Sequence, residues 1–434
     1  MVVARATRAW VLWAIVGSPM PQRRALLMGR MNRRQFVQQG ALGAVAAGLS
    51  LGGTGTAFGA ETAAPRVVKR GDMVYRRLGR TGLMVSELAV GGSPNPEPAI
   101  FTEALDRGLS FVDSSGVYPG SEENIGAVLE GRRDQVTICT KTHFPPTDAK
   151  QSVIAACERA LEKLKTDHID VWCIHGITKP EQFLHDEVQA AFEQLRGQGK
   201  IRFFGVSCHS PLTALPPIIA TGKLDVALIP FNVFSGSTVR KEDVDAGKVY
   251  ENWLADSGLG AVLDLAKTND VGIVAMKTMS GGARQKLDSY QADGATLAQS
   301  KLKWVLSHEA VASALSEVLN YKILDENLGA VGKTLKPEEQ ALLRDHVREA
   351  STRVCRMCGS CERACPAKLP IRDVLRYVVY HDLHGKPERA RSAYQARTAS
   401  GALPRCGDCS ACRQACPHGL DVPGQLLRAR EVLA

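Results

Sequence analysis

The sequence has few cysteines outside its last eighty residues. Only four of its twelve cysteines lie earlier in the chain: Cys139, Cys157, Cys173 and Cys208. Disulfide frameworks are typical of small secreted domains that cannot bury a large core, and a 434-residue chain with a cysteine-poor body does not fit that class. Free cysteine is among the most buried residue types, so these four side chains are expected in the core.

Acidic residues are absent from the first sixty positions, which contain seven arginines. Subtracting these arginines from the formal net charge of +9 leaves +2 for the rest of the chain. A charge this close to zero gives no electrostatic reason to expect a nucleic-acid partner or an anionic membrane surface. The basic character of the sequence therefore belongs to its leader.

The leader is similar to a twin-arginine export signal. Arg33 and Arg34 are followed by Phe36, by a Gly/Ala-rich apolar stretch over 37–58, and by small residues where cleavage would fall. We therefore predict a signal over residues 1–60, the twin-arginine translocase as a partner, and a bacterial periplasmic or exported protein. A chance arginine pair and an uncleaved anchor are the alternatives. No other segment is long and apolar enough to span a membrane, so no span is expected after cleavage.

The body of the chain, residues 72–335, alternates short β-branched runs with amphipathic stretches of helical length. The expected strands cover residues 87–91, 110–113, 136–140, 169–174, 203–206, 226–229, 271–276 and 311–318. The expected helices cover residues 98–106, 122–130, 149–165, 182–194, 211–220, 260–268, 294–307 and 322–331. Eight such units over about 260 residues are typical of an α/β fold, the (β/α)8 TIM barrel.

Two further segments of the body have expected roles. Residues 73–86 carry Gly79 and Gly82 around a turn and predict a short hairpin that closes the bottom of the barrel. The long polar connection over residues 234–257 is the natural candidate for a lid.

Polar side chains follow three neighbouring strands at the point where each strand ends. Asp113 ends the second strand, Lys141 ends the third and His175 ends the fourth, while Tyr118 lies in the loop after Asp113. Because the chemistry of such barrels sits at the carboxyl ends of the strands, these four groups are expected at one mouth. Any one of them alone would more often be a helix cap or a core residue. Cys208 is also expected near this rim.

The last part of the chain, residues 336–434, repeats the pattern C-x2-C-x2-C-x3-C-P twice. The ligands expected for one cubane 4Fe-4S cluster are Cys355, Cys358, Cys361 and Cys416. Those expected for a second are Cys406, Cys409, Cys412 and Cys365. In two-cluster proteins with this spacing the fourth cysteine of each run binds the other cluster. Zinc sites usually take two C-x2-C pairs and close at four ligands, which fits eight cysteines in two identical runs poorly.

The barrel residues resemble the aldo-keto reductase family, over about residues 73–335. The motifs that carry the resemblance surround Asp113 and Tyr118, Lys141, Asp170 to His175, Gly199 to Ser207, Lys277 and Asn327. The doubled cysteine runs narrow the resemblance to an iron–sulfur branch. The second domain resembles a small α-helical ferredoxin-like domain. Its basic residues Arg389, Arg391 and Arg397 could face an acidic redox protein partner or simply be solvated.

The resemblance implies an oxidoreductase that acts on a small carbonyl or alcohol substrate. Tyr118 would protonate the carbonyl oxygen, and the ammonium of Lys141 would lower the pKa of that phenol. Asp113 would pair with Lys141, and His175 would orient the carbonyl. Hydride would come from NADP(H) or NAD(H).

The resemblance also implies contacts to a nicotinamide nucleotide from Ser207, Phe231, Lys277 and Asn327. Here the sequence departs from the family, because Glu317 stands where a basic residue usually meets the 2′-phosphate and would repel it. NADP(H), NAD(H) and no nucleotide all stay open.

Two functions therefore remain possible. The first is an enzyme whose clusters transfer electrons, although hydride carries two electrons together and a cubane cluster carries one. The second is an iron–sulfur electron carrier or binding protein with a degenerate barrel.

Overall fold

The computed structural model divides into two compact units, Met1–Thr62 and Ala63–Ala434. It describes residues 66–235, 258–280, 291–292, 294–350, 353–398 and 409–434, all within the second unit. The predicted signal and most of the predicted lid lie outside the described residues.

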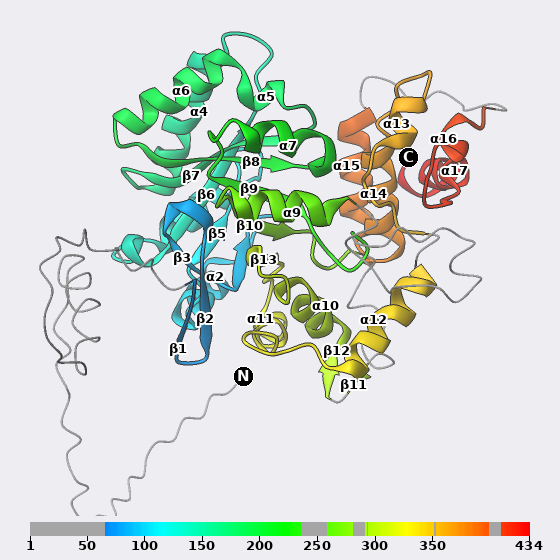
Figure 1. Ribbon diagram of the computed structural model, residues 1–434, viewed down its shortest axis with the longest axis horizontal. Coiled ribbons are helices and arrows are strands. Elements are labelled where there is room, and N and C mark those ends of the chain that lie inside the picture. The colour runs from blue at the N-terminus through cyan, green and yellow to red at the C-terminus, as the bar shows by residue number, and fades with distance from the viewer. Residues whose placement is uncertain (1–65, 236–257, 281–290, 293, 351–352, 399–408) are drawn as a thin grey trace, which may run out of the picture. The chain divides into compact units, whose positions relative to one another are not determined.

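A closed barrel of eight parallel strands forms the body (Figure 1). Around the barrel the order is β10-β13-β4-β5-β6-β7-β8-β9, and β9 pairs with β10 to close it. The strands are β4 (Leu88–Gly91), β5 (Phe111–Asp113), β6 (Thr137–His143), β7 (Ile169–Ile177), β8 (Ile201–Cys208), β9 (Val226–Pro230), β10 (Gly272–Met276) and β13 (Val311–Ser316). Each of the eight expected strands is present, so the predicted TIM-type fold is confirmed.

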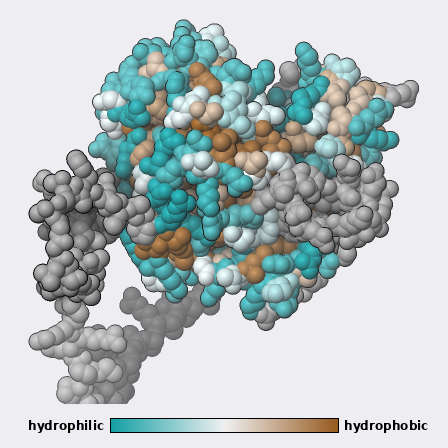
Figure 2. Space-filling model, viewed as in Figure 1, coloured by the Kyte–Doolittle hydropathy of each residue, from teal (hydrophilic) through white to brown (hydrophobic). Residues whose placement is uncertain are grey.

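Helices cover the outside of the barrel. They are α2 (Pro98–Asp106), α3 (Ser121–Val128), α4 (Ala149–Leu164), α5 (Glu181–Leu184), α6 (Asp186–Gly197), α7 (Pro211–Ala220), α9 (Leu259–Thr268), α10 (Leu297–Leu306) and α11 (Tyr321–Leu328). A proline is the first residue of α2 and of α7. An N–H at this position has no hydrogen-bond partner within the helix, so proline, which lacks the N–H, is tolerated there. The stretch expected as one helix over 182–194 is two helices, because His185 leaves the helical conformation between α5 and α6. Figure 2 shows mainly hydrophilic residues over α4 and α6.

The barrel has an inner and an outer apolar layer. Inside, Phe111, Cys139 and Cys173 pack with side chains from the other strands. Outside, a second apolar set lies between the strands and the helices, and it includes Cys157 of α4 and Cys208 of β8. All four cysteines of the body are buried, and Cys208 belongs to this outer layer.

The bottom of the barrel is closed by a small antiparallel sheet of β1 (Val67–Arg70), β2 (Met73–Arg77) and β3 (Met84–Ser86). Leu78 follows β2 and is fully buried in the inner layer. Gly79 has a positive φ of 51°, and a Cβ there would lie 2.2 Å from the backbone nitrogen of Gly272. Only glycine allows this approach. The expected hairpin is thus β2 and β3, with β1 added to it.

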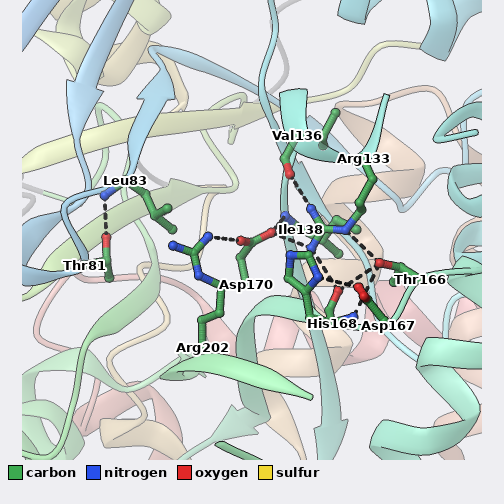
Figure 3. A network of polar contacts seen from close by, with 10 residues as sticks. All are labelled: Thr81, Leu83, Arg133, Val136, Ile138, Thr166, Asp167, His168, Asp170 and Arg202. Carbon is green, nitrogen blue, oxygen red and sulfur yellow. Dashed lines mark hydrogen bonds and ion pairs between the residues drawn. The ribbon is translucent and has the colours of Figure 1, made fainter. Parts of the chain in front are cut away.

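A charged network lies at the amino end of β7 (Figure 3). Asp170 is 2% exposed and accepts hydrogen bonds from Arg133 at 2.8 Å and Arg202 at 2.7 Å. The backbone N–H of Ile138 also donates to this carboxylate, at 3.0 Å. Two guanidinium groups and an amide compensate the buried charge, which ties β6, β7 and β8 together.

The chain after the barrel is helical. Its helices are α12 (Pro337–Ala350), α13 (Ser360–Ala364), α14 (Ile371–Asp382), α15 (Pro387–Thr398), α16 (Ala411–Gln414) and α17 (Val422–Leu433). A buried ion pair of 2.6 Å between Lys303 and Glu339 joins α12 to α10. The helices from α13 onward share a separate apolar core built on α14. Within the described residues, no helix has the length and apolarity that a membrane span requires.

Candidate active site and cluster-binding residues

A cavity of about 1530 Å³ lies at the carboxyl ends of the barrel strands. Asp113, Tyr118, Lys141 and His175 all line it. Asp113 is the last residue of β5, while Lys141 and His175 lie in the later part of β6 and β7. The four groups that were expected at one mouth from the strand ends therefore line one cavity.

Asp113 and Lys141 form a buried ion pair. The Nζ of Lys141 lies 2.5 Å from Asp113 Oδ1 and 2.6 Å from the carbonyl oxygen of Ser114. Burial by itself lowers the pKa of Lys141, but the Asp113 carboxylate reverses this effect and the net pKa is raised. Lys141 is therefore a permanent cation, held by two oxygens at a fixed place in the site.

Tyr118 lies over this cation. The Lys141 Nζ is 5.4 Å from the centre of the Tyr118 ring, and the Tyr118 hydroxyl is 3.5 Å from His175 Nε2. Burial raises the pKa of Tyr118 above its ordinary value, and Lys141 opposes that rise without cancelling it. Lys141 lowers the pKa of Tyr118, as expected, but this effect is smaller than the effect of burial. The phenol is protonated near neutral pH and can donate its proton to a substrate oxygen.

His175 is held by a residue that the sequence analysis did not identify. Ser115 Oγ lies 2.9 Å from His175 Nδ1 and 3.1 Å from the carbonyl oxygen of Lys141. The imidazole of His143 stacks on His175 with the ring centres 4.5 Å apart. Burial, with a smaller effect of Lys141, lowers the pKa of His175 to about 2. The ring is neutral at physiological pH and acts as a hydrogen-bonding group. Its position in the loop between Asp113 and Tyr118 is the feature of the sequence that could have identified Ser115.

Only one of the four residues expected to contact a nucleotide lines the cavity, and this is Lys277. Ser207 is 1% exposed and its Oγ accepts from the N–H of Gly176 at 2.7 Å. Phe231 is fully buried, and its ring stacks on Trp304 with centres 5.1 Å apart. Asn327 is 1% exposed and donates to Ser316 Oγ and to the carbonyl oxygen of Glu317, both at 3.0 Å. These three side chains make contacts within the fold around the site, and their contacts to a nucleotide stay predictions.

Glu317 is engaged by the second domain. Its carboxylate lies 2.5 Å from Lys386 Nζ and 3.7 Å from an Arg389 nitrogen. Arg389 also donates to Ser93 Oγ at 3.3 Å, and Arg372 donates to Ser210 Oγ at 2.6 Å. Two cations therefore neutralise Glu317, so the repulsion of a phosphate expected from Glu317 alone is offset. The same contacts dock α14 and α15 against the rim of the barrel.

Helix α14 forms one wall of the cavity. Arg372, Asp373, Arg376, Tyr377 and Tyr380 all line it, at the spacing of one helical face. Arg376 lies 3.0 Å from Asp373 and donates to the Tyr377 hydroxyl at 3.4 Å. This face of α14 was not predicted, because the helical pattern of a sequence does not show which barrel residues the helix will contact.

The first set of predicted cluster ligands surrounds one small cavity. Cys355, Cys358, Cys361 and Cys416 all line it, together with His418. In the described part of the chain, no three His, Cys, Asp or Glu side chains are close enough to hold a single metal ion. A cubane cluster places each thiolate on a different iron, so its ligands stand farther apart. Four thiols around one cavity therefore fit a cubane.

The second set of predicted ligands is described in part. Cys365 is half-buried, Cys412 is buried and Cys409 is exposed. Cys406 lies outside the described residues. Helices α13 and α16 each contain the third cysteine of a run, and they pack against each other. Notably, Cys355 lines the first cluster cavity and the large catalytic cavity as well.

Comparison with known proteins gives two family matches. The model of the aldo/keto reductase family matches residues 93–348, and the model of the 4Fe-4S dicluster domain matches residues 354–420. The first match includes Asp113, Tyr118, Lys141 and His175, and the second contains both cysteine runs.

The chain is similar to several curated proteins and solved structures. It is 25% identical over 308 residues to the oxidoreductase YqkF of Bacillus subtilis, covering 64% of this chain and 97% of that protein. It is 35% identical over 113 residues to methylglyoxal reductase YeaE of Escherichia coli, covering 26% and 38%. An aldo-keto reductase structure from Bacillus halodurans is 21% identical with a TM-score of 0.49, covering 63% of this chain and 95% of that one.

Proposed function

Because this chain belongs to the aldo/keto reductase family, we propose that it interconverts a carbonyl compound and its alcohol at the cavity lined by Tyr118. The observation that carries the proposal is the distance of 3.5 Å between the Tyr118 hydroxyl and His175 Nε2, beside the ion-paired Lys141. A substrate oxygen within hydrogen-bonding reach of both side chains would meet a proton donor and a neutral imidazole. General acid catalysis of this kind contributes about 10²–10⁴-fold in rate.

The proton chemistry follows from the residues themselves. When a carbonyl is reduced, Tyr118 is the proton donor. The phenolate that remains would be stabilised by the cation of Lys141. Asp113 keeps Lys141 in place and charged. Ser115 fixes the ring of His175, which would orient the carbonyl oxygen toward the phenol.

The source of reducing equivalents is a separate part of the proposal. NADP(H) or NAD(H) stays the sequence-based prediction, although Ser207, Phe231 and Asn327 are engaged in contacts within the fold. Two 4Fe-4S clusters would be held by the second domain, and such clusters transfer single electrons. The place of Cys355 on both cavities favours electron exchange between one cluster and the catalytic cavity.

The second candidate is an electron carrier whose barrel does no chemistry. The buried positions of the three expected nucleotide contacts favour it, and the intact group around Tyr118 opposes it. The two functions make different predictions for the same protein.

The test uses the full chain purified without oxygen and with its clusters intact. Titration with NADPH and NADH is followed by intrinsic fluorescence, and a panel of carbonyl compounds is assayed with chemical or nucleotide reductants. Turnover that is lost in Tyr118→Phe supports the enzyme. Turnover that survives this substitution removes Tyr118 from the mechanism, and clusters that exchange electrons while no carbonyl reacts support the carrier.

We also propose that the protein is exported folded through the twin-arginine route. The support is the Arg33-Arg34 pair before an apolar stretch, and the presence of clusters that must be inserted before export.

A further inference from the structure

The catalytic cavity is unusually rich in cations. Nine basic side chains line it: Lys141, Lys277, Arg363, Lys368, Arg372, Arg376, Lys386, Arg389 and Arg397. Four carboxylates line it: Asp113, Glu317, Glu362 and Asp373. A cavity with this imbalance favours an anionic ligand.

Each of these carboxylates is already paired. Asp113 binds Lys141, Glu317 binds Lys386 and Arg389, and Glu362 binds Arg372. Asp373 is shared between Arg376 and Arg397, each at 3.0 Å. One carboxylate thus serves two guanidinium groups, so the charge of Arg376 is only partly balanced.

Arg376 is half-buried, with part of its hydrogen-bonding capacity unused. Its side chain is 19% exposed, and its Nε is buried with no hydrogen-bond partner among the described residues. A buried donor without a partner destabilises the unliganded protein, and that cost disappears when a ligand accepts its hydrogen. The guanidinium offers donors in a planar fork that matches a carboxylate.

Lys277 stands in the same cavity at the end of β10. It forms no ion pair with any residue in the described part of the chain, and its backbone has a positive φ of 58°. Burial, followed by the Arg376 guanidinium, lowers the pKa of Lys277 to about 7. These two cations repel each other, and an anion between them would remove that repulsion.

Arg376 lines the same cavity as Tyr118, His175 and His209. Its charge acts on all three groups. A group bound by Arg376 would therefore share this cavity with the carbonyl that Tyr118 protonates.

We propose that Arg376 of the iron–sulfur domain, together with Lys277 of the barrel, binds a carboxylate carried by the carbonyl substrate. The inference rests on the proposed function in so far as the ligand is that substrate. It makes the second domain part of the substrate-binding site. An oxo acid is then preferred over a neutral carbonyl compound of the same size.

The test measures binding directly, so that it does not depend on turnover. The full chain with its clusters is titrated calorimetrically with phenylglyoxylate and with its methyl ester, which has the same carbon skeleton without the charge. We expect the acid to bind at least about 10-fold more tightly. Arg376→Gln should weaken the acid by about 30-fold or more and leave the ester unchanged. Arg376→Lys should restore part of the loss.

Arg391→Gln is the matched control. Arg391 is an exposed arginine of α15 that donates to the carbonyl oxygen of Val432 and does not line the cavity. It should bind the acid like the unmodified protein. The visible absorbance of the clusters and the thermal transition show whether each variant is folded.

Several results would overturn the proposal. Equal binding of acid and ester would do so, as would an Arg376→Gln protein that is folded and binds the acid normally. Pyrophosphate and NADPH form a second arm, because a nucleotide phosphate is the other source of a suitable anion. An Arg376→Gln variant that loses only these ligands identifies the nucleotide as the anion and excludes the carboxylate.

Turnover separates this proposal from the proposed function. An acid that binds through Arg376 but is never reduced overturns the proposed function and leaves the anion site standing. An ester that is reduced as well as the acid, with loss of both in Tyr118→Phe, overturns the anion site and leaves the proposed function standing.

Discussion

Lys386 of the iron–sulfur domain lies 2.5 Å from the carboxylate of Glu317 at the end of the last barrel strand. The residue that breaks the family pattern for binding a phosphate is therefore the residue that holds the second domain. Both residues line the cavity of Tyr118 and Lys141, so the two domains share its mouth.

Removing this carboxylate should loosen the second domain. In Glu317→Gln the pairs with Lys386 and Arg389 are lost, and because both are partly exposed the cost in stability is about 1 kcal/mol. Amide hydrogen exchange should become faster in α14 and α15 while the barrel strands stay protected. Glu309→Gln is the control, since it removes a surface pair with Lys267 on the barrel. Identical exchange in the two variants would contradict this role for Glu317.

The contacts that build the mouth explain what could be predicted from the sequence. The barrel follows from local alternation, and Asp113, Lys141 and His175 follow from the rule that parallel strand ends share one edge. Arg372 and Arg389 meet barrel residues 162 and 296 positions away, and no periodic pattern encodes such a meeting. For Phe231, a motif gives the position in the chain but not the direction of the ring, which packs on Trp304.

Ser115 should control the orientation of His175. In Ser115→Ala the imidazole loses its partner at Nδ1, and we expect kcat to fall about 10-fold with little change in KM. Ser114→Ala is the matched control, because this neighbouring buried hydroxyl contacts Ser121 instead. If both substitutions lowered kcat equally, general loosening of the loop would account for the effect.

The neutral state of His175 should appear in the acid stability of the protein. Its pKa is about 2 in the folded chain because of burial, against about 6.5 when unfolded, so the unfolded state binds more protons below pH 6.5. Stability is therefore fully present above that pH and is lost as the pH falls. His175 alone should contribute roughly 1–2 kcal/mol of loss between about pH 7 and pH 5.

Urea unfolding over this pH range measures the effect. His346, His384 and His418 have lowered pKa values from burial as well, so the protein as a whole loses stability in acid. His175→Gln should show a shallower dependence than the unmodified chain. An unchanged slope would mean that the pKa of His175 is the same in the folded and unfolded chains.

Export should depend on both arginines of the leader pair. Arg33→Lys with Arg34→Lys keeps the charge but removes the paired guanidinium groups, and we expect the protein to stay in the cytoplasm with its clusters intact. Arg30→Lys, which changes an arginine just before the pair, should be exported normally. Cell fractionation with antibody detection distinguishes the outcomes, and export of the double variant would remove the twin-arginine assignment.

The place of Cys416 predicts which cluster it serves. Cys416 stands in the second cysteine run, yet it lines a cavity with Cys355, Cys358 and Cys361 of the first run. Loss of any ligand should destroy the cluster that it binds. Two substitutions at the same cluster should therefore remove no more iron than one substitution does. Cys361→Ser combined with Cys416→Ser should therefore keep about four irons per chain, whereas Cys409→Ser combined with Cys416→Ser should keep almost none. Iron and sulfide analysis of anaerobic protein measures this directly. If the second pair kept about four irons and the first pair kept none, each cysteine run would bind its own cluster, and the cross-ligation inferred from the cavity would be wrong.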